Sequence, residues 1–204
     1  MTALLLLRHG QSTWNAERRW QGWADAPLSE LGERQARDAA DHLADSGLTV
    51  ATSSDLTRAR RTAEIVARTL GIDLIGAEPD LRERDVGHWT GLTVQEIETR
   101  WPEEMAAQRA GRLARQPGGE DTTTLLKRCM DALARLAVEL AGEVPLVVTH
   151  GGVIRSLERA LDVEPPPSTP NLAGRWFMWN GTGLEPGDPV VPVDPDLSTA
   201  PPTR

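Results

Sequence analysis

Short apolar runs alternate with longer amphipathic stretches along most of this chain. Short runs of mainly apolar residues predict strands, whereas apolar residues at three- and four-residue spacing predict helices. We expect strands at residues 3–8, 49–53, 72–75, 146–149 and, at a sheet edge, 175–179, and helices at residues 29–45, 55–70, 93–109, 121–140 and 153–161. This alternation favours a parallel sheet covered by helices. The expected fold class is therefore α/β, a three-layer α/β/α sandwich with a mostly parallel central sheet.

Polar and turn-forming residues interrupt this pattern and set the limits of the domain. Ser29 is a good N-cap, Gly71 ends a helix, and Pro102 must lie near a turn or a helix start. Proline and glycine dominate the end of the chain, and we see no internal repeat. We therefore expect one domain over residues 1–180 and, over residues 181–204, a Pro/Gly-rich tail that lacks stable structure.

Two histidines lie in similar contexts at opposite ends of the chain. His9 follows an apolar run and Arg8, and His150 follows the run at residues 146–149; each histidine precedes a glycine. In an open α/β sheet, ligands bind just beyond the carboxyl ends of the strands. We therefore expect both imidazoles to project into one crevice. A structural role in a turn is the alternative for either histidine.

A third polar segment, residues 54–62, also begins beyond a predicted strand. Ser54 or Asp55 can cap the helix that follows, and a helix N-terminus offers free N–H groups and a positive dipole end to an anion. Arg58 lies in the first turn, and we expect it to point into the crevice as a phosphate ligand. The alternative is that Arg58, like Arg61, is a solvated surface charge.

Acidic residues gather in a loop at residues 81–91. Its spacing alone gives no mechanism, and solvated charges are the simplest interpretation. Only the paired histidines and arginines elsewhere make an acid–base carboxylate attractive. The candidates are Glu83 and Asp85 within the loop and Glu120 further along.

Composition narrows the partners of such a site. The 204 residues carry a formal net charge of −8, which argues against nucleic acid binding and means that an anionic substrate needs a locally positive pocket. One cysteine excludes an internal disulfide and fits a cytoplasmic location. Residues 4–7 are too short for a membrane span. No ligand pair has short metal-site spacing, so we expect no metal and no cofactor. The pattern does not indicate the oligomeric state.

A series of short motifs runs through residues 3–162. The motifs are Arg8-His9-Gly10-Gln11-Ser12-Thr13-Trp14-Asn15, Gln21-Gly22, Pro27-Leu28-Ser29-Glu30-Leu31-Gly32, Ser54-Asp55-Leu56-Thr57-Arg58-Ala59, Leu81-Arg82-Glu83 with Gly87, Gly118-Gly119-Glu120 and Thr149-His150-Gly151-Gly152. In this order they resemble those of the histidine phosphatase superfamily, the phosphoglycerate mutase-like family. Each motif alone is weak to moderate, but their common order makes a chance match improbable.

The resemblance implies a phosphohistidine mechanism on a phosphoglycerate mutase-like fold. It makes His9 the nucleophile that carries the phosphoryl group, and it makes Glu83 the acid that protonates the leaving oxygen and later deprotonates water. Arginine suits the phosphate because its planar fork donates two parallel hydrogen bonds and stays charged, so no metal is required. The phosphate-binding positions that the resemblance implies are Arg8, Asn15, Gln21, Gly22, Arg58, His150 and Gly151.

The sequence thus predicts a metal-independent phosphatase that hydrolyses a small-molecule phosphomonoester through phosphohistidine. A bisphosphoglycerate-dependent phosphoglycerate mutase is the alternative, although the segment between Gly91 and Gly118 is short for a cofactor-dependent mutase. Arg109, Arg112 and Arg115 in that segment could partly substitute for the missing basic residues. A non-catalytic member of the fold that binds phospho-ligands is the second alternative, against which the intact histidines and arginines argue.

Overall fold

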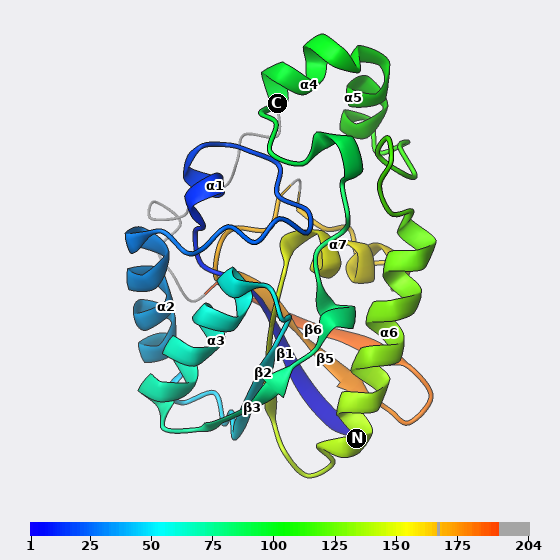
Figure 1. Ribbon diagram of the computed structural model, residues 1–204. Coiled ribbons are helices and arrows are strands. Elements are labelled where there is room, and N and C mark those ends of the chain that lie inside the picture. The colour runs from blue at the N-terminus through cyan, green and yellow to red at the C-terminus, as the bar shows by residue number, and fades with distance from the viewer. Residues whose placement is uncertain (167, 192–204) are drawn as a thin grey trace.

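The computed structural model describes residues 1–166 and 168–191, and Figure 1 shows the arrangement of their elements. The strands are β1 (Thr2–Arg8), β2 (Val50–Ser53), β3 (Asp73–Ala77), β4 (Pro145–Thr149), β5 (Gly174–Trp179) and β6 (Leu184–Val190). The α-helices are α1 (Thr13–Ala16), α2 (Glu30–Leu43), α3 (Thr57–Leu70), α4 (Val94–Arg100), α5 (Pro102–Arg109), α6 (Thr122–Glu139) and α7 (Gly151–Ala160), and the 3-10 helices are η1 (Pro79–Leu81) and η2 (Gly87–Trp89).

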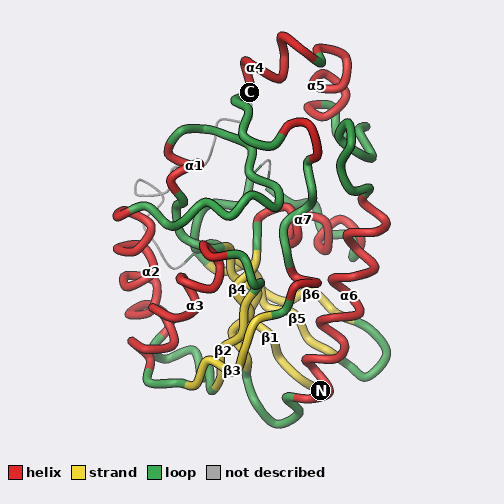
Figure 2. The backbone as a smooth tube through the Cα atoms, viewed as in Figure 1, coloured by secondary structure: helices red, strands yellow, loops and turns green. Residues whose placement is uncertain are grey.

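The strands form one sheet of six, in the order β3-β2-β4-β1-β5-β6. The first four strands along the chain run parallel to one another, whereas β5 and β6 are antiparallel to their neighbours. Figure 2 shows the strands in yellow, with helices in red on either side. The expected α/β fold with a mostly parallel central sheet is confirmed.

The side chains of β1 alternate between two cores, one on each face of the sheet. Leu5 and Leu7 pack in a core with residues of α2 and α3, whereas Leu4 and Leu6 pack in a core with residues of α6 and α7. Successive strand side chains point to opposite faces, so a continuous leucine run requires a helical layer on both. Figure 1 shows α2 and α3 on one side of the sheet and α6 on the other, which confirms the three layers.

Parallel pairing brings the carboxyl ends of β1, β2 and β4 to one edge of the sheet. Arg8 lies opposite Thr149, and Ser53 lies opposite Val148. The loops that leave these strands are therefore neighbours although they are far apart in the sequence. The helices α3 and α7 begin at the same edge, where the candidate site residues lie.

The segment above this edge has a small core of its own. Val86, Trp89, Ile97 and Met105 are buried together there. The helix expected over residues 93–109 is wrong in one respect, because it is divided into α4 and α5. Pro102 starts the second helix, and the residue before it has the non-helical angles φ −137° and ψ 63°, as the proline ring requires.

The strand β6 corrects two expectations about the end of the domain. Residues after 180 do not all lack structure, because Leu184–Val190 pairs with β5 and the Leu184 side chain is buried in the core. The strand β5, expected at a sheet edge, consequently lies inside the sheet. The edge strand tolerates Pro186 and Pro189, since an edge position need not donate every backbone N–H. Residues 192–204 of the expected tail lie outside the described residues.

The longest helix, α6, is amphipathic and begins with a side-chain cap. The Asp121 carboxylate accepts a hydrogen bond from the backbone N–H of Thr124 at 2.8 Å, and Cys129 lies on the buried face. Burial raises the pKa of the Cys129 thiol to about 12, in keeping with a packing role. Within the described residues, no helix is long and apolar enough to cross a membrane.

The loop after β1 packs against the first turn of α2 with no room for a side chain. A methyl group added at Gly10 would lie 2.6 Å from the Gly32 carbonyl oxygen, and one added at Gly32 would lie 2.0 Å from the Gln11 carbonyl oxygen. The Ser29 hydroxyl caps the helix by accepting from Gly32 N–H at 3.0 Å. The start of α2 therefore fixes the position of the loop that carries His9.

We expect Gly32→Ala to destabilise the protein by about 2 kcal/mol, because overpacking between backbone segments that cannot move costs about 1–3 kcal/mol. Urea denaturation followed by circular dichroism measures the change. Gly183→Ala is the matched control, since nothing lies within 4 Å of its added methyl group, and it should stay within about 0.5 kcal/mol of the parent. Equal stability of the two variants would contradict the close packing.

Candidate active site

His9 lies just beyond β1, buried, with both ring nitrogens engaged. Its Nδ1 is 2.6 Å from the Gly10 carbonyl oxygen. Because a carbonyl only accepts, Nδ1 carries the proton and Nε2 keeps its lone pair. The Nε2 atom accepts a hydrogen bond from Arg58 Nε at 3.2 Å. The structure thus sets the tautomer in which Nε2 is the free base and faces an arginine.

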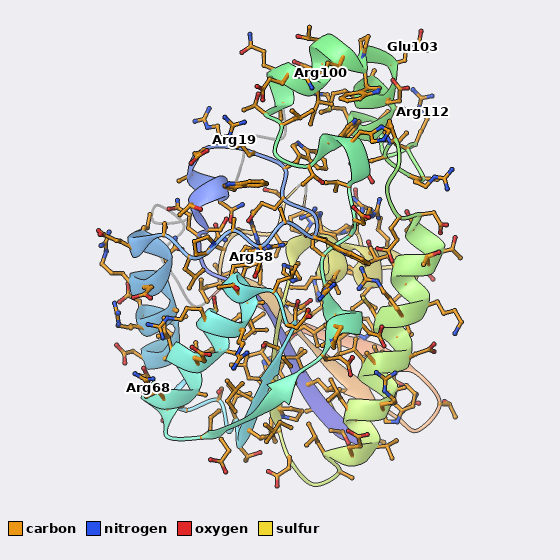
Figure 3. All side chains as sticks on the ribbon, in the orientation of Figure 1. Arg19, Arg58, Arg68, Arg100, Glu103 and Arg112 are labelled. Atoms are coloured by element: carbon orange, nitrogen blue, oxygen red, sulfur yellow. The ribbon has the colours of Figure 1, made fainter. Side chains whose placement is uncertain are left out.

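Arg58 is completely buried in the first turn of α3, and Figure 3 labels it above the sheet. Its two terminal nitrogens donate to the carbonyls of Ala24 and Gly22, each at 2.8 Å. Arg8 ends β1 and is also buried, with Nη1 donating to the Thr169 carbonyl. Neither arginine forms an ion pair with an acid in the described part of the chain, so both charges are available to an anion.

His150 lies at the end of β4, with its ring centroid 5.2 Å from that of His9. Its Nε2 is 2.9 Å from the hydroxyl of Ser54, which also accepts from the backbone N–H of Leu56 at 3.3 Å. A hydroxyl has one proton and two acceptor lone pairs, so Ser54 can donate to Nε2 while it accepts from Leu56, and the ring proton of His150 then lies on Nδ1. The Nδ1 atom is buried and has no partner among the described residues. Buried polar atoms in proteins nearly always have a partner, so this nitrogen fits a ligand oxygen.

The electrostatics of the pocket hold its histidines neutral and its arginines charged. Burial, followed by the charge of Arg58, lowers the pKa of both His9 and His150 well below the usual value. Burial also lowers the pKa of Arg8 and of Arg58, in each case to about 10, which leaves both charged at neutral pH. The site therefore offers neutral imidazoles among permanent positive charges.

Glu83 lies in the loop after η1, with its carboxylate at the start of α7. Its carboxylate accepts from the N–H of Gly152 at 3.0 Å and from the N–H of Arg84 at 2.8 Å. Its negative charge acts favourably on both Arg8 and Arg58, so it faces the same pocket. The other candidate carboxylates are engaged elsewhere: Asp85 accepts from the N–H of Gly87, and Glu120 pairs with Arg128.

Arg128 of α6 holds the backbone around Glu83 in place. Its guanidinium donates to the carbonyls of Asp80, Arg82 and Glu83 at 2.6–2.9 Å. Both oxygens of Glu120 accept from the same group at 2.8 Å. One buried ion pair thus fixes the segment that carries Glu83. The indole N–H of Trp23 adds a hydrogen bond to the same Glu83 carbonyl at 2.7 Å.

The remaining predicted phosphate-binding residues lie around the pocket, in supporting positions. The Asn15 amide oxygen completes the capping box of α1 with Ser12, and the Gln21 amide oxygen accepts from the Ser12 hydroxyl at 2.7 Å. Gly22 gives its carbonyl to Arg58. Gly151 is the first residue of α7, next to His150.

The predicted cap of α3 is wrong. Neither Ser54 nor Asp55 caps this helix; instead, Asp25 accepts from the backbone N–H and from the hydroxyl of Thr57, both at 2.7 Å. Asp55 pairs with Arg82. Asp25 thus occupies the first N–H of α3, and this helix contributes the side chain of Arg58 to the pocket.

Sequence reasoning missed several residues that shape the site. Arg128 gave no local signal, because the three backbone carbonyls to which it donates lie 45–48 residues away in the sequence. Asn171 was also missed, although its amide donates to the His9 carbonyl at 2.9 Å. Arg155, four residues into α7, approaches Arg8 at the edge of the pocket. The sequence did offer a signal for Arg155, because it lies one helical turn beyond Gly151 and so on the same face of the helix.

No group of three or more His, Cys, Asp or Glu side chains is placed to hold a metal ion within residues 1–166 and 168–191. The polar groups that converge on the pocket are those of arginine and histidine, with one carboxylate. Such groups suit a phosphate or a similar anion.

The α/β fold matches that of a phosphoglycerate mutase among the solved structures. The chain belongs to the histidine phosphatase superfamily: the family model for branch 1 matches residues 4–179. Phosphoglycerate mutase-like protein 4 of Arabidopsis thaliana is 42% identical over 161 residues, which cover 77% of this chain and 70% of that protein. A metal-independent phosphoserine phosphatase of the same plant is 41% identical over 160 residues, covering 77% and 67%.

The fold is also similar to that of solved structures. The mycobacterial glucosyl-3-phosphoglycerate phosphatase in complex with VO3 superposes with a TM-score of 0.81 at 30% identity. The match covers 91% of this chain and 96% of that one. The similarity therefore extends over the sheet, both helical layers and the site edge.

We expect the free energy of unfolding to fall between pH 7.5 and pH 5.5 in phosphate-free buffer. The pKa of His9 and of His150 is lowered in the native state, so the unfolded chain binds more protons once the pH falls through about 6.5. Each buried histidine should account for a loss of about 1 kcal/mol over this range. Urea denaturation at several pH values measures the loss.

In the His150→Asn variant, the fall in the free energy of unfolding between pH 7.5 and pH 5.5 should be about half as large. His42→Asn, at an exposed position of α2, serves as the control and should keep all of it. A stability that stays constant from pH 7.5 to pH 5.5 in the parent protein would contradict the neutral, buried state of the two rings.

Proposed function

We propose that this protein is a metal-independent phosphatase that hydrolyses phosphomonoesters through a phosphohistidine intermediate on His9. The observation that carries the proposal is the free-base Nε2 of His9, which faces the Arg58 guanidinium in a buried pocket. A neutral imidazole is a competent nucleophile near pH 7. Its neighbours are the cations that a phosphate dianion needs.

The transferring phosphoryl group would bind between Arg8, Arg58 and His150. Within the described residues, neither arginine forms an ion pair with an acid, and the buried Nδ1 of His150 has no partner. Phosphoryl transfer spreads negative charge over three equatorial oxygens, which positioned cationic donors stabilise in a pocket shielded from water. On binding, the Nε–H of Arg58 would turn from His9 Nε2 to a phosphate oxygen.

In the first step the lone pair of His9 Nε2 attacks phosphorus, and the bond between phosphorus and the ester oxygen breaks. The protonated carboxyl of Glu83 gives its proton to the leaving oxygen, so that an alcohol departs. The hydrogen bond from His9 Nδ1–H to the Gly10 carbonyl stabilises the positive charge that develops on the ring. The products of this step are the alcohol, phosphohistidine and the Glu83 carboxylate.

In the second step the Glu83 carboxylate takes a proton from water as the water oxygen attacks phosphorus. The phosphorus–nitrogen bond breaks, the electron pair returns to Nε2, and inorganic phosphate leaves. Hydrogen bonds from the Gly152 N–H to the Glu83 carboxylate and from Arg128 to the Glu83 carbonyl hold this residue in a constant position through both steps. A group that acts first as acid and then as base requires such a fixed position.

The charge balance supports catalysis without a metal. Arg8 and Arg58 supply two fixed positive charges, and the neutral His150 adds a hydrogen-bond donor. A metal ion would otherwise contribute the same electrostatic stabilisation. The relative named as a metal-independent phosphoserine phosphatase and the phosphatase among the structural neighbours support this activity and a small phosphorylated substrate.

The phosphoglycerate mutase alternative finds less support in the α4–α5 segment. Figure 3 shows Arg100 and Arg112 of this part of the chain well away from Arg58. Arg109 forms an ion pair with Glu98, and Arg115 is exposed. These basic residues are therefore poorly placed to hold the second phosphate of a bisphosphorylated cofactor at the pocket. A non-catalytic protein that only binds phospho-ligands would not need the free-base nitrogen of His9 as a nucleophile.

Brief reaction with a ³²P-labelled phosphomonoester, quenched in alkali, should leave a label on the protein that is stable to base and labile to acid. The label should form in the presence of excess chelator, because arginine supplies the positive charge. His9→Ala should carry no label and release no phosphate, whereas the exposed His42→Ala should match the parent. A label that persists in His9→Ala, or that requires an added divalent ion, would overturn the proposal.

Glu83→Gln should slow hydrolysis of an alkyl phosphate by about 10²–10⁴-fold, the usual contribution of a general acid. An aryl phosphate such as p-nitrophenyl phosphate should suffer much less in its first step, because an aryl oxygen leaves without full protonation. Single-turnover kinetics on both esters measure the difference. Asp85→Asn is the matched control from the same loop; if it alone showed the dependence on leaving group, the acid would be Asp85.

A further inference from the structure

Two arginines beside the pocket are left without an acidic partner. Arg155 of α7 is half-buried and makes no hydrogen bond or ion pair with any residue that the structure describes. Arg84, in the loop after Glu83, is also half-buried, and its guanidinium makes one long contact of 3.4 Å, to the Ser156 hydroxyl. Burying an arginine without a counter-charge is costly, so this pair needs an explanation.

The acids nearest to these arginines each have another partner, although the buried Oε2 of Glu158 has none among the described residues. Glu158 pairs with Arg175 at 2.8 Å, and Glu120 pairs with Arg128 at 2.8 Å. The Asp121 carboxylate caps α6, and Glu83 accepts from backbone N–H groups. In a chain with a net charge of −8, nearby carboxylates were available, yet none of those that the structure describes forms an ion pair with either arginine.

The two arginines border the phosphate pocket. A methyl group added at Gly151 would lie 3.1 Å from Arg155 Nη1 and 3.3 Å from Arg8 Cδ, so Arg155 and Arg8 meet over this glycine. Arg84 joins them through its contact with the neighbouring residue of α7, Ser156. Burial lowers the pKa of both Arg84 and Arg155, the negative charge of Glu83 raises it, and the positive charge of the exposed Arg159 lowers it. Positive charge is thus concentrated on this side of the pocket.

We propose that Arg155 and Arg84 form a subsite for a second anionic group, a carboxylate or a phosphoryl group, on the same substrate molecule. The subsite rests on the proposed function, because its place is defined relative to the phosphate that Arg8 and Arg58 would bind. The planar fork of an arginine matches either anion. The preferred substrates are therefore small phosphomonoesters that carry an additional acid, rather than neutral alkyl phosphates.

Phosphonates test this subsite without turnover, because their carbon–phosphorus bond is not hydrolysed. Calorimetry compares 3-phosphonopropionate with ethylphosphonate and 4-phosphonobutyrate with propylphosphonate; within each pair only the carboxylate differs. We expect at least one acid to bind about tenfold more tightly than its partner, the effect of one charge-assisted hydrogen bond. Propane-1,3-bisphosphonate replaces the carboxylate by a second phosphoryl-like group; if it alone shows the gain, the second anion is phosphoryl.

Variants then assign the gain to the two arginines. The affinity ratio is the affinity for a phosphonate acid divided by that for its partner without the second acid. Arg155→Met and Arg84→Met, which keep most of the side-chain stem, should each reduce this ratio at least threefold. Arg155→Lys should keep part of the gain. Arg68→Met is the control for net charge, since this arginine is exposed at the far end of α3 in Figure 3, and it should keep the full ratio. Thermal unfolding checks that each variant is folded.

Three results would overturn the subsite: ratios near one in the parent protein, a ratio that survives both methionine variants, or an equal loss of affinity for all the phosphonates. The last would place Arg155 in the phosphate site itself. Hydrolysis of p-nitrophenyl phosphate by the parent, and its loss in His9→Ala, tests the proposed function separately. Selective binding of diacids without hydrolysis would retain the subsite and refute the phosphatase, and the reverse result would retain only the phosphatase.

Discussion

The buried guanidinium of Arg58 is the group on which the site most depends. It donates to His9 Nε2 at 3.2 Å and to the carbonyls of Gly22 and Ala24 at 2.8 Å. A buried charge needs full hydrogen bonding or a counter-ion, and here backbone carbonyls stabilise it without neutralising it. The same side chain therefore joins the loop after β1 to the start of α3 and keeps a positive charge inside the pocket. That charge also helps to keep both histidines neutral.

The acidic residues of the chain stabilise the framework and leave the pocket positive. Asp25 caps α3, Glu120 holds Arg128, and Glu158 holds Arg175. The overall charge of −8 thus coexists with a cluster of unpaired arginines at one edge of the sheet. Local arrangement, rather than net charge, sets the electrostatic potential that an anionic ligand meets on entering a cleft.

Precise placement of the site residues follows from rigid neighbours. His9 and His150 follow central strands whose leucine and valine side chains are completely buried, and the loop after β1 packs backbone against backbone on α2. Glu83 lies in an irregular loop, yet Arg128 binds three carbonyls of its segment. A residue on a loop can thus be held as firmly as one on a strand, which is what positioned acid–base groups need.

The sequence by itself determined the layers, the strand ends and the two histidines. The leucine run of β1 requires helices on both faces, and an apolar run that ends in His-Gly marks a site at the end of a strand. These are local signals, because periodicity and turn chemistry depend on residues close together in the chain. The cap at Asp121 was predictable for the same reason.

Only the tertiary structure decided which distant groups meet. β6 was hidden because proline and glycine weaken strand propensity, whereas pairing with β5 and burial of Leu184 provide its stability. Asp25 replaces the expected cap of α3 from a different segment, and Arg128 reaches Glu83 from α6. Arg84 and Arg155 are recognisable as arginines without an ion pair only once the neighbouring acids among the described residues are seen with other partners. Such contacts depend on distances in space, which spacing along a single chain does not encode.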